Sequence, residues 1–291
     1  MVIYLGGAIP LFFYRMAFVH QDKPLLETGR PRNLFSPAGE ILHLMQSAGR
    51  HVYMDIEFGY VYGTSREVMM PIEIGAVLHR PEDESLSYAA EQFRYDLDVE
   101  IWKKVTDPCG RTAGVETTVS NLSRGECGMP YDHSYRLPDD EVETAEMTAQ
   151  RAFSDLRDFL ESIVSRKGAT AIIVFAASME RRAFRAAGFS PDGCAFVDLQ
   201  REIRRRLKMK QFLSLDRLAC MIGFSTDGAT ISSAHFQYPV PQGYLHLLGA
   251  HRGLGDAVRT FLVAREFQEH LPYLGERIRN LVETGGGNGE E

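Results

Sequence analysis

The sequence predicts an α/β fold in which a mixed five-stranded sheet, an antiparallel meander joined to parallel strands, is flanked by helices. Residues 51–57, 71–78 and 87–97 are apolar or alternate in polarity, as strands do. The charged segment 81–85 between the second and third of these is a turn, so the three strands are expected to form a meander. Strand and helix patterns then alternate downstream, which implies crossover helices between parallel strands.

The second half of the chain supplies the alternating elements. Residues 140–166 carry apolar side chains at helical spacing, which predicts a long helix. The continuous apolar run 169–176 is typical of a strand that is covered on both faces. We expect three further elements after it: a helix over 179–187 that ends at Gly188, a strand over 194–198 and a helix over 199–207.

The chain of 291 residues, 44% hydrophobic, is long enough to bury a full core. We predict an N-terminal extension over 1–49, one domain over 50–270, and a C-terminal helix with a disordered tail over 271–291. Residues 106–140 are rich in Gly, Pro, Thr, Ser and Asp, which predicts a long irregular connection. Such a connection inside a compact domain is more often functional than idle.

Charge and cysteine content narrow the function classes. With 32 Lys and Arg against 39 Asp and Glu, the net charge is −7 and the isoelectric point about 5.8, which excludes a globally basic nucleic-acid binder but not a local basic groove. Four cysteines without close pairing read as reduced thiols, so we expect a cytoplasmic protein. Cys109, Cys127 and His133 offer a zinc alternative, although their spacing matches no common zinc module.

The apolar opening of the chain raises the question of a membrane segment. Residues 1–14 lack a basic start, contain Gly6, Gly7 and Pro10, and are followed by Arg15, so the run is too short to span a bilayer. We expect a buried strand or a docking segment and no membrane association. The alternative is contact with a partner, giving a homodimer or a larger assembly through the extension.

Two carboxylates follow the apolar run 51–54. In a strand, Asp55 and Glu57 are two residues apart and therefore project from the same face. Two adjacent acids repel each other unless a cation joins them, and Mg²⁺ or Mn²⁺ prefers such oxygen ligands. The pair suggests a phosphoryl-transfer site, while the alternative is a strand end with two solvated acids.

A second motif opens a helix near the C-terminus. His251 precedes Asp256 by five positions, and apolar residues continue at helical spacing from Phe261 to Phe267. An aspartate in the first helical turn is favoured by the positive end of the helix dipole. A histidine beside it is suited to deprotonate water near neutral pH.

Together these motifs resemble the DEDDh branch of the DnaQ-like 3′-to-5′ exonucleases, which have a ribonuclease H-like fold. The resemblance rests on Asp55-x-Glu57, on Pro-Ile-Glu-Ile-Gly-Ala-Val over 71–77 and on His251-x4-Asp256, and it covers about residues 50–268. Two connecting segments, 196–199 and 213–223, also resemble those of the family.

The chain departs from the family pattern at two places. The third acid, normally an aspartate after a Gly- or Asn-rich turn, is Glu180 here, following Phe175-Ala-Ala-Ser-Met. Gly253 and Gly255 lie between His251 and Asp256, and two glycines are expected to loosen this segment and to permit its closure over a substrate.

The resemblance implies a role for each matching residue. Asp55, Glu57 and Asp256 would ligate one Mg²⁺ or Mn²⁺ ion, Asp55 would bridge to a second ion, and Glu180 would assist that second ion through water. His251 would act as general base on the attacking water, with the two ions clamping the displacement. The implied activity releases nucleoside 5′-monophosphates from the 3′ end of single-stranded RNA or DNA.

Substrate contacts are assigned to side chains near these acids. Phe58 and Tyr60 follow the acidic pair and would stack on the terminal base, with core packing as the alternative. Arg181 and Arg182 add positive charge beside Glu180. A basic stripe that would follow a phosphate backbone, with a solvated helix face as its alternative, consists of Arg201, Arg204, Arg205, Arg206, Lys208 and Lys210.

The sequence leaves two rival functions. An active exonuclease is favoured by the presence of Asp55, Glu57, His251 and Asp256. A catalytically weak nucleic-acid-binding or scaffold protein that keeps the fold is favoured by Glu180 and by the glycines that follow His251.

Overall fold

The computed structural model describes residues 49–62, 67–93, 138–209 and 213–285. Apart from Gly49 and residues 138–140, the predicted N-terminal extension and the predicted irregular connection lie outside these ranges. The cysteine and histidine group of residues 109, 127 and 133 also lies outside them.

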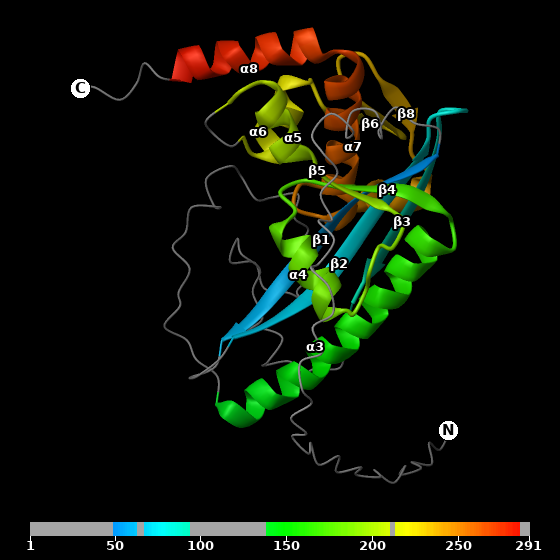
Figure 1. Ribbon diagram of the computed structural model, residues 1–291, viewed down its shortest axis with the longest axis vertical. Helices are drawn as coiled ribbons and strands as arrows, with labels where there is room; N and C mark the ends of the chain where they lie inside the picture. Colours follow the sequence, from blue (N-terminus) through cyan, green and yellow to red (C-terminus); the bar gives the residue numbers. More distant parts are fainter. Residues whose placement is uncertain (1–48, 63–66, 94–137, 210–212, 286–291) are drawn as a thin grey trace, which may run out of the picture. The chain divides into compact units, whose positions relative to one another are not determined.

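The main sheet has five strands in the order β3-β2-β1-β4-β5 (Figure 1). The antiparallel pairs β1 with β2 and β2 with β3 form the predicted meander, while β1 with β4 and β4 with β5 are parallel. This confirms a mixed α/β sheet. Its strands are β1 Arg50–Tyr62, β2 Glu67–Arg80, β3 Ser85–Gln92, β4 Ala169–Val174 and β5 Ala195–Asp198.

The predicted helices are present in the predicted order, and two short ones, α6 and η4, were not predicted. Residues 140–166 were expected to form one helix, and they form an α-helix followed by a short π-helical segment. The helical elements are α3 Asp139–Leu160, η3 Glu161–Ser165, α4 Ser178–Ala186, α5 Leu199–Arg206, α6 Leu215–Met221, η4 Gln242–Leu247, α7 Gly253–Glu269 and α8 Leu271–Gly285.

A second, small antiparallel sheet was not predicted. It has the order β6-β7-β8, with strands β6 Ser225–Asp227, β7 Thr230–Ser232 and β8 Gln237–Pro239. Three-residue strands are too short to show a clear alternation of polarity, which is why the sequence pattern gave no sign of them.

Alternate residues of β1 pack into different cores. Val52, Met54 and Ile56 belong to the cluster that includes α3 and α4 residues. Tyr53 belongs to the cluster built on α7, where its ring lies 5.1 Å from that of Phe261 in an edge-on arrangement. The two-residue period therefore turns the odd-numbered residues of β1 toward α7.

Helix α7 lies at the centre of the second core. From Gly253 to Phe267 it is buried except at Asp256, and residues of α5, α6 and α8 pack in the same cluster. Leu274 and Ile278 of α8 are 0% and 2% exposed in this core. The core packing is therefore continuous across residue 270, where the predicted C-terminal helix begins. In the part of the chain that the structure describes, we find no helix with the length and apolarity needed to cross a membrane.

One buried histidine joins the sheet to α7 through its neutral form. His79 on β2 is 3% exposed, and its Nε2 accepts a hydrogen bond from Nη1 of Arg265 at 3.1 Å. Burial and the Arg265 charge lower the pKa of His79 to about 4, against the opposing effect of Glu84. The folded state therefore favours the neutral ring.

We predict that His79 makes the fold sensitive to acid. Its folded pKa lies below the value of about 6.5 for an unfolded histidine, so its contribution is complete above pH 6.5 and is lost as the pH falls toward 4. Between pH 7 and 4.5, the free energy of unfolding should fall by about 2–3 kcal/mol more in the wild type than in His79→Gln. Urea unfolding at both pH values measures this difference. An equal fall in the free energy of unfolding in the two proteins would contradict the role assigned to His79.

Candidate metal centre

Three carboxylates meet where α7 begins beside the sheet. Asp55 and Glu57 come from β1 and Asp256 from the first turn of α7, and each offers an oxygen within 4.8 Å of the others. All three are partly exposed, so a ligand from solvent has access to them. The structure thus brings together two acids predicted from the strand pattern and one predicted from the helix pattern.

Glycines allow α7 to approach the strands this closely. A Cβ on Gly75 would lie 2.0 Å from the backbone nitrogen of Leu254, and one on Gly253 would lie 2.7 Å from the nitrogen of Gly75 and 3.2 Å from the carbonyl of Asp55. A Cβ on Gly255 would meet the Gly249 carbonyl at 1.9 Å. The interpretation that the two α7 glycines loosen the segment is therefore corrected: both lie in tight backbone packing.

A buried glutamate caps this end of α7. Glu73 lies opposite Glu57 in the β1–β2 register and is 6% exposed. Its Oε1 accepts the backbone N–H of Gly253 at 2.9 Å, and Nε of Arg252 donates to both carboxylate oxygens at 3.0 and 2.9 Å. The Arg252 guanidinium and the positive N-terminal end of α7 thereby balance the negative charge of Glu73. These contacts fix α7 on the sheet.

The sheet is irregular beside the acids. The β1–β2 register shifts between Glu57 and Phe58, because Glu57 pairs with Glu73 and Phe58 with Pro71, so the extra residue of this bulge is Ile72 on β2. Bulges bend a strand and change the direction of its side chains, and they are frequent beside functional sites.

Unbalanced negative charge accumulates at Asp55. Burial raises the pKa of its carboxyl well above the ordinary value, and the nearby charges of Glu57, Asp256, Glu180 and Glu73 raise it further. Burial also raises the pKa of Asp256, although Arg259 and His251 act in the opposite direction. Carboxyl groups with raised pKa values that face one another form a site that favours a bound cation.

Glu180 lies at the edge of this charge cluster. It sits in the first turn of α4, is 4% exposed, and its Oε2 is buried without a hydrogen-bond partner. Burial, followed by the charges of Asp198 and Glu57, raises its pKa to about 8. Its carboxylate is not part of the compact group of Asp55, Glu57 and Asp256, which agrees with an indirect role.

Asp198 holds the turn that presents Glu180. It caps α5 by accepting the Arg201 N–H at 3.0 Å, and its other oxygen accepts the Ala177 N–H at 3.3 Å. The residue before that, Ala176, has a left-handed φ of 61°. An Asn- or Gly-rich turn would adopt this backbone with less strain.

His251 lies beside the carboxylates and has a carboxylate partner of its own. Its backbone is left-handed, with φ 56°, and its N–H donates to Oδ1 of Asp256 at 3.3 Å. The side chain is 29% exposed, and Nε2 lies 3.8 Å from Oδ2 of Asp216 on α6. No role for Asp216 was predicted from the sequence. The sequence feature that could have drawn attention to Asp216 is its place in the first turn of α6, two residues after the N-cap Ser214.

Arg259 is a second partner that the sequence analysis missed. Its Nη1 donates to Oδ1 of Asp256 at 3.1 Å and to the carbonyl of Gly249 at 3.2 Å, and the guanidinium lies 4.7 Å from the Phe224 ring centre. The sequence could have indicated this pair, because residues three apart on one helix, such as Asp256 and Arg259, are neighbours on its surface.

The predicted substrate-binding residues differ in their exposure to solvent. Phe58 is 4% exposed and packs with the α3 and α4 core, which is the core-packing alternative and leaves its ring little access to a base. Tyr60 belongs to β1, and its side chain lies outside the described part. Arg181 is partly exposed, with its guanidinium 5.1 Å from the Phe196 ring centre, and Arg182 is exposed beside Glu180.

Members of the basic stripe differ in their contacts and in their exposure. On α5, Arg205 forms an ion pair with the buried Glu202, and Nε of Arg204 donates to the carbonyl of Met209 at 3.2 Å, so both have structural contacts. Lys210 lies outside the described residues. The exposed members are Arg201, Arg205, Arg206 and Lys208.

Comparison with known proteins adds no assignment, because no family model matches the chain and a search of curated proteins finds no significant match. The candidate site therefore stands on its own geometry.

We predict that Gly75→Ala disrupts the site and the fold together. The new methyl group would overlap backbone atoms of α7, which cannot move without losing the Glu73 cap. We expect the free energy of unfolding to fall by at least about 3 kcal/mol. Gly243→Ala is the matched control, since a Cβ there meets no atom within 4 Å, and its effect should stay within about 1 kcal/mol. Similar effects for the two variants would contradict the close approach.

We also predict that Asp55→Asn stabilises the metal-free protein. The substitution removes one of several crowded acidic groups, so the free energy of unfolding in EDTA should rise by about 0.5–2 kcal/mol. Mg²⁺ should raise the melting temperature of the wild type and not that of the variant. Asp227→Asn, at an exposed acid of β6, serves as the control and should match the wild type in both buffers.

Proposed function

We propose that this protein is a metal-dependent 3′-to-5′ exonuclease that removes nucleoside 5′-monophosphates from single-stranded RNA or DNA. The observation that carries the proposal is the meeting of Asp55, Glu57 and Asp256 within 4.8 Å, with His251 adjacent. Asp55 and Glu57 lie on β1 of a mixed sheet that is compatible with a ribonuclease H-like arrangement, and Asp256 lies on the helix packed against it.

The donor set fits Mg²⁺ or Mn²⁺. All three close ligand atoms are carboxylate oxygens, the type that hard divalent cations prefer. The buried Oε2 of Glu180 has no hydrogen-bond partner, which leaves an acceptor for a water or a cation at the edge of the site. When bound, two such ions would polarise the phosphate, lower the pKa of a water and stabilise the leaving oxygen.

The protein side chains would divide the remaining tasks. Asp55, Glu57 and Asp256 would hold the metal ions, with Glu180 as a further acceptor. His251 would take the proton of the attacking water, since its ring is partly exposed beside Asp256. Asp216, 3.8 Å from Nε2 of His251, would orient the ring and stabilise its protonated form.

Exposed positive side chains of α4 and α5 would supply the binding surface for the nucleic acid. Arg182 is exposed two residues after Glu180 on α4, Arg206 is exposed at the end of α5, and Lys208 is exposed just after it. Contacts of this kind bind phosphates of any sequence and weaken as salt rises.

One observation favours the second candidate, a catalytically weak nucleic-acid-binding protein. Arg259 occupies Oδ1 of Asp256, and its charge competes with a cation for that carboxylate. Among the described residues, no hydrogen bond or ion pair involves the other oxygen of Asp256, so we favour the exonuclease.

We predict a metal-dependent ladder of products. The purified protein should shorten single-stranded RNA or DNA from a free 3′ end with Mg²⁺ or Mn²⁺, and should leave 3′-blocked strands and EDTA-treated samples intact. Asp55→Asn should reduce the rate at least about 100-fold, and His251→Ala about 100-fold or more. Product length on denaturing gels, with RNA and DNA assayed in parallel, measures both effects.

The outcomes separate the two candidates. Asp227→Asn should retain the wild-type rate, because this acid is exposed and distant in sequence from the site. Undiminished cleavage by Asp55→Asn would place the activity elsewhere. Retained binding of the strands without cleavage by the wild type would instead support the binding protein.

A further inference from the structure

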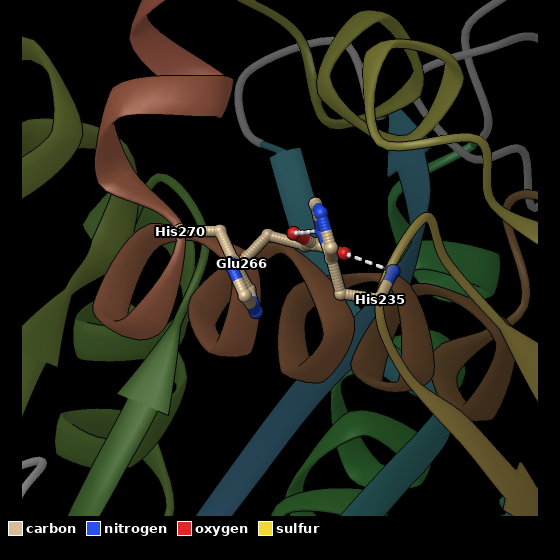
Figure 2. Close-up of side chains that lie close together, drawn as sticks. All are labelled: His235, Glu266 and His270. Atoms are coloured by element: carbon tan, nitrogen blue, oxygen red, sulfur yellow. Dashed lines mark hydrogen bonds and ion pairs between the residues drawn. The ribbon is translucent and has the colours of Figure 1, made fainter.

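A second group of metal-ligating side chains lies at the opposite end of α7. Glu266 is in the last turns of this helix, His270 follows its end, and His235 lies in the turn between β7 and β8. Each of the three offers an atom within 4.8 Å of the others. Figure 2 shows the three side chains gathered together, with the Glu266 carboxylate held by His235.

The Glu266 carboxylate is buried without a permanent positive charge. It is 0% exposed and accepts hydrogen bonds from the Ser233 hydroxyl at 2.8 Å, the His235 backbone N–H at 3.0 Å and Nδ1 of His235 at 2.8 Å. Among the described residues, no lysine or arginine forms an ion pair with it. Burial of a carboxylate is unfavourable unless a positive group compensates it, so this site calls for a cation.

The two imidazoles lie against each other beside that carboxylate. Their rings are stacked, with centroids 3.8 Å apart and planes inclined by 15°. Tyr273 packs edge-on against His235 at 4.8 Å, and Phe236 lies 5.5 Å from His270. The end of α7 contributes as well, because His270 is its C-cap and donates its backbone N–H to the Glu266 carbonyl at 2.9 Å, which holds the two residues one turn apart.

The donor types favour zinc over magnesium. Imidazole nitrogen with one carboxylate oxygen is a typical ligand set of zinc, whereas Mg²⁺ prefers oxygen alone. Two zinc ligands at about 2.1 Å in tetrahedral geometry lie roughly 3.4 Å apart. The present 2.8 Å between Nδ1 of His235 and the Glu266 oxygen would therefore widen by about 0.6 Å as a metal replaces the shared proton.

We propose that His235, Glu266 and His270 form a zinc site, with solvent as a fourth ligand. The metal would join the β7–β8 turn to the α7–α8 junction and neutralise the buried carboxylate. The site is separate from the proposed catalytic centre, because Asp256 and Glu266 are ten residues apart on one helix, about 15 Å along its axis. The proposal does not depend on the exonuclease activity.

Zinc titration of the full chain tests this proposal. The protein is held in excess Mg²⁺, to occupy the carboxylate centre, and zinc binding is measured by competition with a chromophoric chelator. We expect the wild type to bind one more zinc ion than His235→Ala or His270→Ala, with affinity at that site reduced at least about 100-fold in each variant. Both variants keep the cysteines and the other acids, so zinc bound at those groups cancels when the zinc bound by a variant is subtracted from that bound by the wild type.

His246→Ala is the matched control, since this histidine is exposed on η4 and should leave binding unchanged. Thermal unfolding supplies a second readout: zinc at about 100 times its Kd should raise the melting temperature of the wild type and the control by about 5 °C or more, and that of the two variants by less than about 1 °C. Melting curves in EDTA show whether each variant is folded. Equal zinc binding by the wild type and His270→Ala, or loss in only one of the two variants, would overturn the proposed site.

Discussion

The backbone contact between the start of α7 and strands β1 and β2 is the constraint on which the rest of the structure depends. Gly75 and Gly253 remove the side chains that would separate helix from sheet, and the Glu73 carboxylate fixes the resulting contact through the Gly253 N–H. At this distance the first helical turn places Asp256 beside the two acids of β1. A longer distance would leave three unconnected acids and a histidine without a shared site.

This arrangement concentrates negative charge that the protein neutralises only in part. Glu73 has Arg252 and Asp256 has Arg259, while the pKa of Asp55 is raised by burial and by its acidic neighbours. Part of the folding free energy is therefore spent on holding like charges together. Functional sites often show this conflict between stability and activity, and here it supports a role for cations in the proposed function.

Helix α7 connects two regions of different chemistry. Its first turn contributes a carboxylate to an all-oxygen site, and its last turns contribute Glu266 beside two imidazoles. Between them the helix is buried nearly all round, and Arg265 reaches back to His79 of the sheet. A rigid central helix of this kind keeps both groups at a fixed separation, so either can be altered without moving the other.

Short-range patterns in the sequence were enough to establish the mixed sheet, the meander and most helices. The two-residue period of β1 also fixed the common direction of Asp55 and Glu57, and helix-start rules located Asp256, because these features depend on neighbours within one element. Tertiary structure alone decided which distant residues meet: Glu73 and Arg252, Asp216 and His251, and Glu266 with His235. It also buried Phe58 and showed that the α7 glycines serve close packing. The physical reason is that periodicity determines the direction of a side chain, whereas its partner depends on how closely two backbones approach, and no local pattern contains that distance.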